Sequence, residues 1–108
     1  MLSVGYIEMR DGPMNEAASE ADFAVQLRAE GYTEVEIKEY APRAGNGRHR
    51  HHFAVKGLVL SGAFIVQQDD EPVTFSPGEV FTVAYGALHD EWIGPAGAKV
   101  LVGRKFEK

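Results

Sequence analysis

The spacing of apolar residues changes at Glu34, and the part of the chain that follows constrains the fold most strongly. Val35 and Ile37 alternate with charged residues, a period of two that is typical of a β-strand with one buried face. Short runs rich in Val, Phe, Ile and Leu then follow, separated by turn residues. Regular short strands of this kind predict a β-barrel or a β-sandwich. We expect breaks between strands at residues 42–47, 62, 68–72, 76–78, 85–87 and 94–97.

The first third of the chain has a different pattern. Residues 4–9 are predicted to form a short strand, and Asp11-Gly12-Pro13 then interrupts regular structure. The Ala- and Glu-rich segment that follows predicts a helix with Ser19 as its N-cap. Gly31 is expected to end this helix at about Glu30, because glycine readily adopts the left-handed conformation after a last turn. We therefore expect one short helix beside a sheet.

The length and composition limit the function classes. A chain of 108 residues fits one domain, which we divide into an extension over 1–33 and a β-barrel over 34–108. The absence of cysteine excludes disulfides and thiolate ligands, so chemistry must come from histidines, carboxylates or hydroxyls. A net charge of -5 without a basic stripe argues against nucleic-acid and membrane partners. No signal-peptide pattern or membrane span is visible, and we expect a cytoplasmic protein.

The four histidines are concentrated in two places along the sequence. His49, His51 and His52 precede one apolar run, and His89 follows some forty residues later. On an extended chain His49 and His51 face the same side, and His52 faces away. With His89 from a second strand they would form a three-histidine face for one ion, with coordination positions left open. The alternative is a solvent-exposed basic patch whose histidines bind nothing.

The surroundings of these histidines resemble the cupin family. Its first motif runs Gly, a gap, His-x-His, a short gap, Glu, six residues and Gly. With Gly62 as the final glycine, the two histidines of the motif fall on His49 and His51. The glutamate of the motif falls on Val55, so this chain lacks that carboxylate.

The second cupin motif is also similar to a segment of this chain. It runs Gly, five residues, Pro-x-Gly, two residues, His and, after a short gap, Asn, and it matches Gly78, Gly86 and His89. Ala84 stands in place of the proline and Ile93 in place of the asparagine. The whole resemblance covers roughly residues 40–104. It implies a mainly β, cupin-like antiparallel β-barrel, or jelly roll, with a short N-terminal helix.

The resemblance also implies one divalent metal ion, and the sequence leaves Fe, Mn, Ni and Zn as candidates. We predict that His49, His51 and His89 bind it. Glu91 lies on the same face as His89 by strand parity, so it could replace the missing ligand or act as a general base. The alternative for Glu91 is a hydrogen bond to a histidine ring or an ion pair with a surface arginine.

Three aromatic residues are candidates for the substrate pocket. Phe53 shares the strand parity of His51 and could form a wall of the pocket. Tyr40 and Tyr85 have polar tips that could line the mouth of a barrel. Packed, purely structural tyrosines would have the same sequence pattern.

The sequence supports three functional readings. In the first, the chain is a metal-dependent enzyme acting on a small oxygen-rich molecule, as an isomerase, lyase, hydrolase or dioxygenase. In the second, it is a non-catalytic barrel that binds or senses a small molecule, and in the third its site is degenerate and empty. The resemblance implies a homodimer, and residues 4–9 could pair with the sheet of a second copy.

Overall fold

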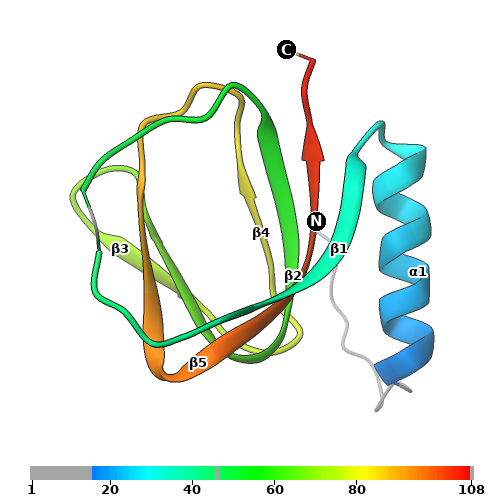
Figure 1. Ribbon diagram of the computed structural model, residues 1–108, viewed down its shortest axis with the longest axis horizontal. Helices are drawn as coiled ribbons and strands as arrows, with labels where there is room; N and C mark the ends of the chain where they lie inside the picture. Colours follow the sequence, from blue (N-terminus) through cyan, green and yellow to red (C-terminus); the bar gives the residue numbers. More distant parts are fainter. Residues whose placement is uncertain (1–15, 46, 108) are drawn as a thin grey trace.

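The structure is a computed structural model, and it describes residues 16–45 and 47–107. Within these ranges one antiparallel sheet curls around an apolar core, and a single helix lies outside it (Figure 1). The helix is not long and apolar enough to cross a membrane. The elements are α1 (Glu16–Ala29), β1 (Thr33–Tyr40), β2 (Ala54–Gln67), β3 (Pro72–Phe75), β4 (Val80–Val83) and β5 (Asp90–Lys105).

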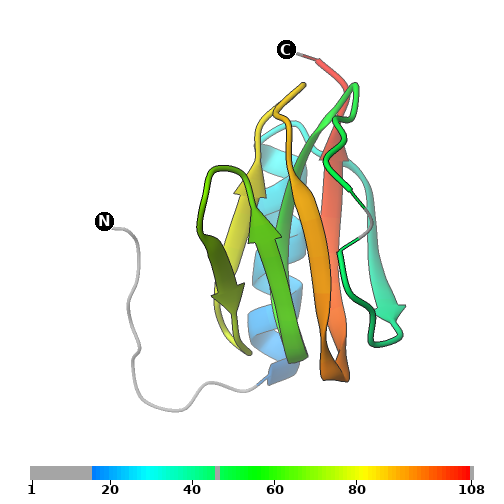
Figure 2. The same ribbon diagram turned by 90° about the vertical axis from the view of Figure 1, so that its left-hand side faces the viewer.

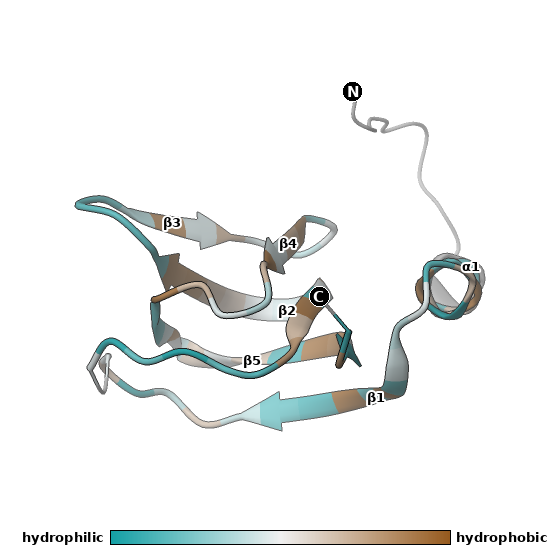
Figure 3. Ribbon diagram, turned by 90° about the horizontal axis from the view of Figure 1, so that it is seen from above, coloured by the Kyte–Doolittle hydropathy of each residue, from teal (hydrophilic) through white to brown (hydrophobic). Residues whose placement is uncertain are grey.

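Two long strands organise the sheet. β2 pairs antiparallel with β5 along its whole length, from the pair Ala54 and Lys105 to the pair Gln67 and Asp90. On its other edge β2 pairs first with β4 and then, nearer its end, with β3. β1 extends the sheet beyond β5. Seen from above, β3 and β4 therefore lie on one side of β2, with β5 and β1 on the other (Figure 3).

Both long strands bend at glycines, which corrects two of the expected breaks. The strands were expected to end at Gly62 and at residues 94–97, but β2 and β5 continue through these positions. The register between them shifts around Gly62, and both Gly62 and Gly97 have a φ of 78°. A β-carbon on Gly62 would collide with the carbonyl oxygen of Gly97. The glycines thus form bulges at a corner where two backbones meet, because only glycine allows this conformation and this approach.

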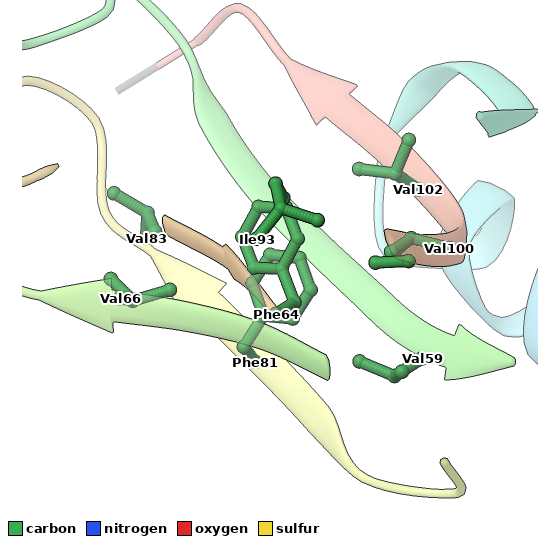
Figure 4. Close-up of a cluster of buried hydrophobic side chains, with 9 residues drawn as sticks. Val59, Phe64, Val66, Phe81, Val83, Ile93, Val100 and Val102 are labelled. Carbon is green, nitrogen blue, oxygen red and sulfur yellow. The ribbon is translucent and has the colours of Figure 1, made fainter. Parts of the chain in front are cut away.

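The barrel interior is filled by alternate residues of the strands. The rings of Phe64 and Phe81 stack with 4.5 Å between their centroids at the centre of this cluster. The side chains point toward one another from β2, β4 and β5 (Figure 4). Their burial provides the main stabilisation of the barrel, since apolar area removed from water is the dominant favourable term in folding. The cluster consists of Val59, Phe64, Val66, Phe81, Val83, Ile93, Ala98, Val100 and Val102.

A second, smaller apolar cluster fixes the helix to the outside of the sheet (Figure 2). Leu58 and Leu101 alternate with their interior neighbours Val59 and Val100, and they pack on the side of the sheet that faces α1. Leu27 and Phe23 of α1 cover them, and the side chain of Leu27 is fully buried. The expected position of the helix against the sheet follows from this contact.

The predicted start of α1 differs from the structure, whereas its predicted end agrees with it. The predicted N-cap at Ser19 is wrong, because the helix begins at Glu16 and Ser19 lies within it. The predicted end is confirmed. Gly31 has a φ of 95°, its N–H donates to the carbonyl of Arg28, and the N–H of Tyr32 donates to the carbonyl of Leu27. This pair of hydrogen bonds is the Schellman motif, which needs a left-handed residue after the helix.

The free edge of β1 bears on the expected dimer. Among the described residues β1 pairs only with β5, so its other edge is open to a further strand. Residues 4–9, predicted to pair with a second copy, lie outside the described residues. The homodimer therefore stays a prediction.

The corner at Gly62 gives a prediction about stability. Gly62→Ala should lower the free energy of unfolding by about 2–5 kcal/mol, because it adds a collision to the cost of a left-handed alanine. Gly78→Ala is the matched control, since Gly78 has a φ of 90° but no atom within 4 Å of an added β-carbon, and should cost about 1–2 kcal/mol. Urea denaturation measures both. Equal losses would contradict a close approach at the corner.

Candidate metal site

A short backbone bridge joins the two segments that carry the histidines. The N–H of His49 donates to the carbonyl of His89 at 2.8 Å, and the N–H of His89 donates back at 2.9 Å. The N–H of Gly86 also donates to the carbonyl of His51 at 3.0 Å. The loop between β1 and β2 therefore runs beside the turn that leads into β5 (Figure 1). Main-chain hydrogen bonds thus hold side chains from distant parts of the sequence together.

Four potential ligands converge at this bridge. One ligand atom each of His49, His51, His89 and Glu91 lies within 4.8 Å of all the others. Two nitrogen ligands of one ion are at most about 4.2 Å apart, given bonds of about 2.1 Å. Small side-chain rotations would therefore suffice to close these four around an ion. His89 is completely buried, whereas His51 is 31% exposed and opens the group to solvent.

Hydrogen bonds to the backbone fix the tautomers of two of the rings. Nδ1 of His49 lies 2.9 Å from the carbonyl oxygen of Gly47, and Nδ1 of His89 lies 3.0 Å from that of Ala87. A carbonyl oxygen only accepts hydrogen bonds, so each Nδ1 must carry a proton. In the neutral rings the lone pair is then on Nε2. This is the arrangement by which proteins orient histidine ligands of metal ions.

The contact between His89 and Glu91 requires a positive charge. Nε2 of His89 and Oε2 of Glu91 are 2.8 Å apart. With its proton on Nδ1, a neutral His89 presents a lone pair to a carboxylate, and two acceptors at this distance repel one another. Either a second proton on His89 or a shared cation removes the repulsion. The donor set is therefore chemically suited to a metal ion.

Burial affects the third histidine. Partial burial lowers the pKa of His51 from its usual value of 6.5, and the nearby His89, His49 and Arg104 act in the same direction. The carboxylate of Glu91, 3.8 Å from Nε2 of His51, opposes this effect. The net lowering favours the neutral ring, which is the form that binds a metal ion.

The three predicted pocket residues have different positions. Phe53 lies against the group, since its ring stacks on that of His51 with centroids 4.7 Å apart. Tyr40 packs edge-on against Phe64 in the barrel core. Its pKa is raised by burial and, to a smaller extent, by the charge of Glu91. The structure thus places Phe53 beside the ligands and Tyr40 at the adjoining core.

The remaining predicted pocket residue lies elsewhere. The ring of Tyr85 faces His52, with 6.4 Å between the ring centroids. His52 is exposed and is not among the four converging ligands.

Val55, which occupies the position of the missing motif glutamate, packs against the barrel core. The carboxylate of the group comes from Glu91 on β5 instead.

Glu91 makes both contacts of the alternative given for it, a hydrogen bond to the ring of His89 and an ion pair with an arginine, and the sequence did not indicate that this arginine is Arg43. Its Nη2 lies 3.5 Å from Oε1 of Glu91, on the side of the carboxylate away from the oxygen that meets the histidines. Its backbone pairs with Ile93 of β5 through two hydrogen bonds, of 3.2 and 2.9 Å. Arg43 belongs to an irregular loop, where no side-chain period predicts direction, so no sequence signal could place it here.

Comparisons with known proteins identify the fold. No protein-family model matches the sequence, and no curated protein matches it. Solved structures do match. A cupin superfamily protein from Desulfitobacterium hafniense aligns with 68% of this chain and 66% of its own, at 18% identity and a TM-score of 0.57. KdgF from Halomonas sp. aligns with 67% of this chain and 66% of its own, at 22% identity and a TM-score of 0.55.

A third similar structure is the polyketide cyclase RemF from Streptomyces resistomycificus. It aligns with 71% of this chain and 68% of its own, at 21% identity and a TM-score of 0.53. The chain spans just under two thirds of the length of the first two proteins. These likenesses confirm the predicted fold: the chain is a small cupin-fold protein, with an antiparallel jelly roll and a short N-terminal helix.

The geometry predicts which histidines bind metal. His51→Ala should weaken Zn²⁺ binding to the metal-free protein by at least about a hundredfold, or about 2.7 kcal/mol, because a ligand is lost. His52→Ala is the matched control, since His52 is exposed and outside the group, and should leave the affinity unchanged. Isothermal titration calorimetry measures both. Similar losses in the two variants would indicate the exposed basic patch instead.

Proposed function

We propose that this protein holds one divalent transition-metal ion on His49, His51, His89 and Glu91, and that it is an enzyme acting on a small oxygen-rich molecule. The convergence of four ligand atoms within 4.8 Å supports the metal site. That convergence carries the proposal, and the 2.8 Å contact between Nε2 of His89 and Oε2 of Glu91 is compatible with it, because a shared cation would bind both atoms.

The donor set limits the ion and its chemistry. Three imidazole nitrogens and one carboxylate oxygen suit Fe, Mn, Ni or Zn. When bound, such an ion acts as a Lewis acid toward an oxygen of the substrate. The partly exposed ring of His51 marks the side from which a small molecule reaches the group. The described residues provide four ligands, and an ion that accepts five or six keeps positions for substrate.

The protein side chains have distinct roles in this proposal. His49 and His89 are held as Nε2 donors by their hydrogen bonds to Gly47 and Ala87. Glu91 directs Oε2 toward the histidines and Oε1 toward Arg43. We assign Glu91 as the ligand that replaces the carboxylate missing at position 55, since one of its oxygens already lies among the ring nitrogens.

The class of reaction is proposed only broadly. RemF is described as a polyketide cyclase, so a barrel with this fold can serve as an enzyme. We retain the isomerase, lyase, hydrolase and dioxygenase classes, in each of which a bound metal ion can polarise an oxygen of the substrate or bind dioxygen. A non-catalytic binding barrel is the alternative. It would bind its small molecule without converting it.

The role of Glu91 can be tested without a known substrate. Glu91→Gln keeps the shape of the side chain but removes the charge, so Zn²⁺ affinity should fall at least about tenfold, or about 1.4 kcal/mol. Glu71→Gln, an exposed carboxylate in the turn before β3, is the matched control and should bind as the parent does. Calorimetry gives both values. An unchanged affinity in Glu91→Gln would remove Glu91 from the ligands and favour its role as a general base.

A further inference from the structure

Arg43 is a half-buried arginine beside the proposed metal site. Its positive charge must share the carboxylate of Glu91 with the bound ion. Among the described residues its only side-chain partner is Glu91, at a distance of 3.5 Å. A guanidinium has five N–H donors, and most of those of Arg43 have no partner among residues 16–45 and 47–107. The side chain is 35% exposed and so contacts both the carboxylate and the solvent beside it.

The backbone of Arg43 holds it at this place. Arg43 forms an antiparallel bridge with Ile93, two residues along β5 from Glu91. Both main-chain hydrogen bonds of that bridge are present, at 3.2 and 2.9 Å. The backbone of Arg43 is therefore paired with the same strand that supplies the carboxylate.

The charges at the site do not balance once an ion is bound. A divalent ion brings two positive charges, the three neutral histidines bring none, and Glu91 brings one negative charge. One positive charge then remains at the ion, and Arg43 adds a second. The carboxylate of Glu91 cannot compensate both, so the metal-loaded site favours an anion.

A second arginine near the site is already compensated. Arg104 lies over the ring of Phe53, with 5.5 Å between its guanidinium carbon and the ring centroid. Its Nη1 lies 3.3 Å from a carboxylate oxygen of Glu34 and 3.3 Å from one of Glu36. Arg104 is therefore also an arginine near the site, but two carboxylates already compensate its positive charge.

The apolar surroundings restrict the kind of anion. Phe53 stacks on His51, and the exposed ring of Phe106 lies 5.2 Å beyond Phe53, measured between centroids. These rings form an aromatic wall beside the ligands. The single guanidinium of Arg43, on the other side of Glu91, suits the singly charged carboxylate of an organic acid better than a phosphate, which usually needs more donors.

We propose that Arg43 binds the carboxylate group of the substrate, and that the substrate is a small organic acid. This inference rests on the proposed function, because the surplus positive charge exists only when a metal ion is bound. Arg43 is then a specificity-determining residue. The carboxylate of the substrate takes the place that the carboxylate of Glu91 has beside Arg43 in the metal-free protein.

The test uses the cobalt-loaded full chain, whose visible absorption reports ligands at the metal. Acetate, its neutral isostere acetamide and inorganic phosphate are titrated into the parent, Arg43→Gln and Arg104→Gln. The parent should bind acetate more tightly than acetamide and more tightly than phosphate. Arg43→Gln should bind acetate at least about tenfold more weakly, or about 1.4 kcal/mol, with acetamide unaffected. Arg104→Gln should bind acetate as the parent does, and all three should bind cobalt equally.

The outcomes separate this inference from the proposed function. A parent that takes up no cobalt overturns the proposed function and this inference with it. Cobalt uptake with undetectable acetate binding, or with equal acetate affinity in Arg43→Gln, overturns only the role of Arg43. Weaker cobalt binding in Arg43→Gln would show that Arg43 merely positions Glu91, and tighter binding of phosphate than acetate would reject the carboxylate class.

Discussion

The continuous pairing of β2 with β5 is the interaction on which the other parts of the structure depend. β1 is attached to β5, while β3 and β4 are attached to β2, so each remaining strand joins the sheet through one of these two. The pair can close around a core only because both strands bend where Gly62 approaches Gly97. The inner residues of the two strands then form the barrel core, and their outward residues receive α1.

The candidate site follows from this arrangement through main-chain contacts. β5 presents Glu91 directly. Arg43 is bridged to Ile93 of β5, and His49 is bridged to His89 immediately before β5. The ring nitrogens are in turn oriented by backbone carbonyls at Gly47 and Ala87. The backbone therefore brings together the four residues that could hold an ion. The close contact between Nε2 of His89 and the carboxylate of Glu91 then requires either a second proton on His89 or a shared cation.

Sequence patterns predicted the features that depend on local periodicity. The alternation after Glu34 indicated the strands, Gly31 indicated the helix end, and strand parity put Glu91 beside His89, where the structure also has it. Glycine was ambiguous, because Gly62 forms a bulge within a strand whereas the same residue often separates strands. Arg43 could not be found, since the course of an irregular loop depends on long-range pairing with β5 that no local pattern encodes.

The most direct test of the account is the location of the ion itself. Crystals of tag-free protein grown with Mn²⁺ or Zn²⁺ would be measured at the absorption edge of that metal, where anomalous scattering identifies it. The account predicts a single strong peak bounded by Nε2 of His49, His51 and His89 and by a carboxylate oxygen of Glu91, at about 2.0–2.2 Å from each. A peak elsewhere, or well-ordered rings of these histidines with no peak between them, would contradict it.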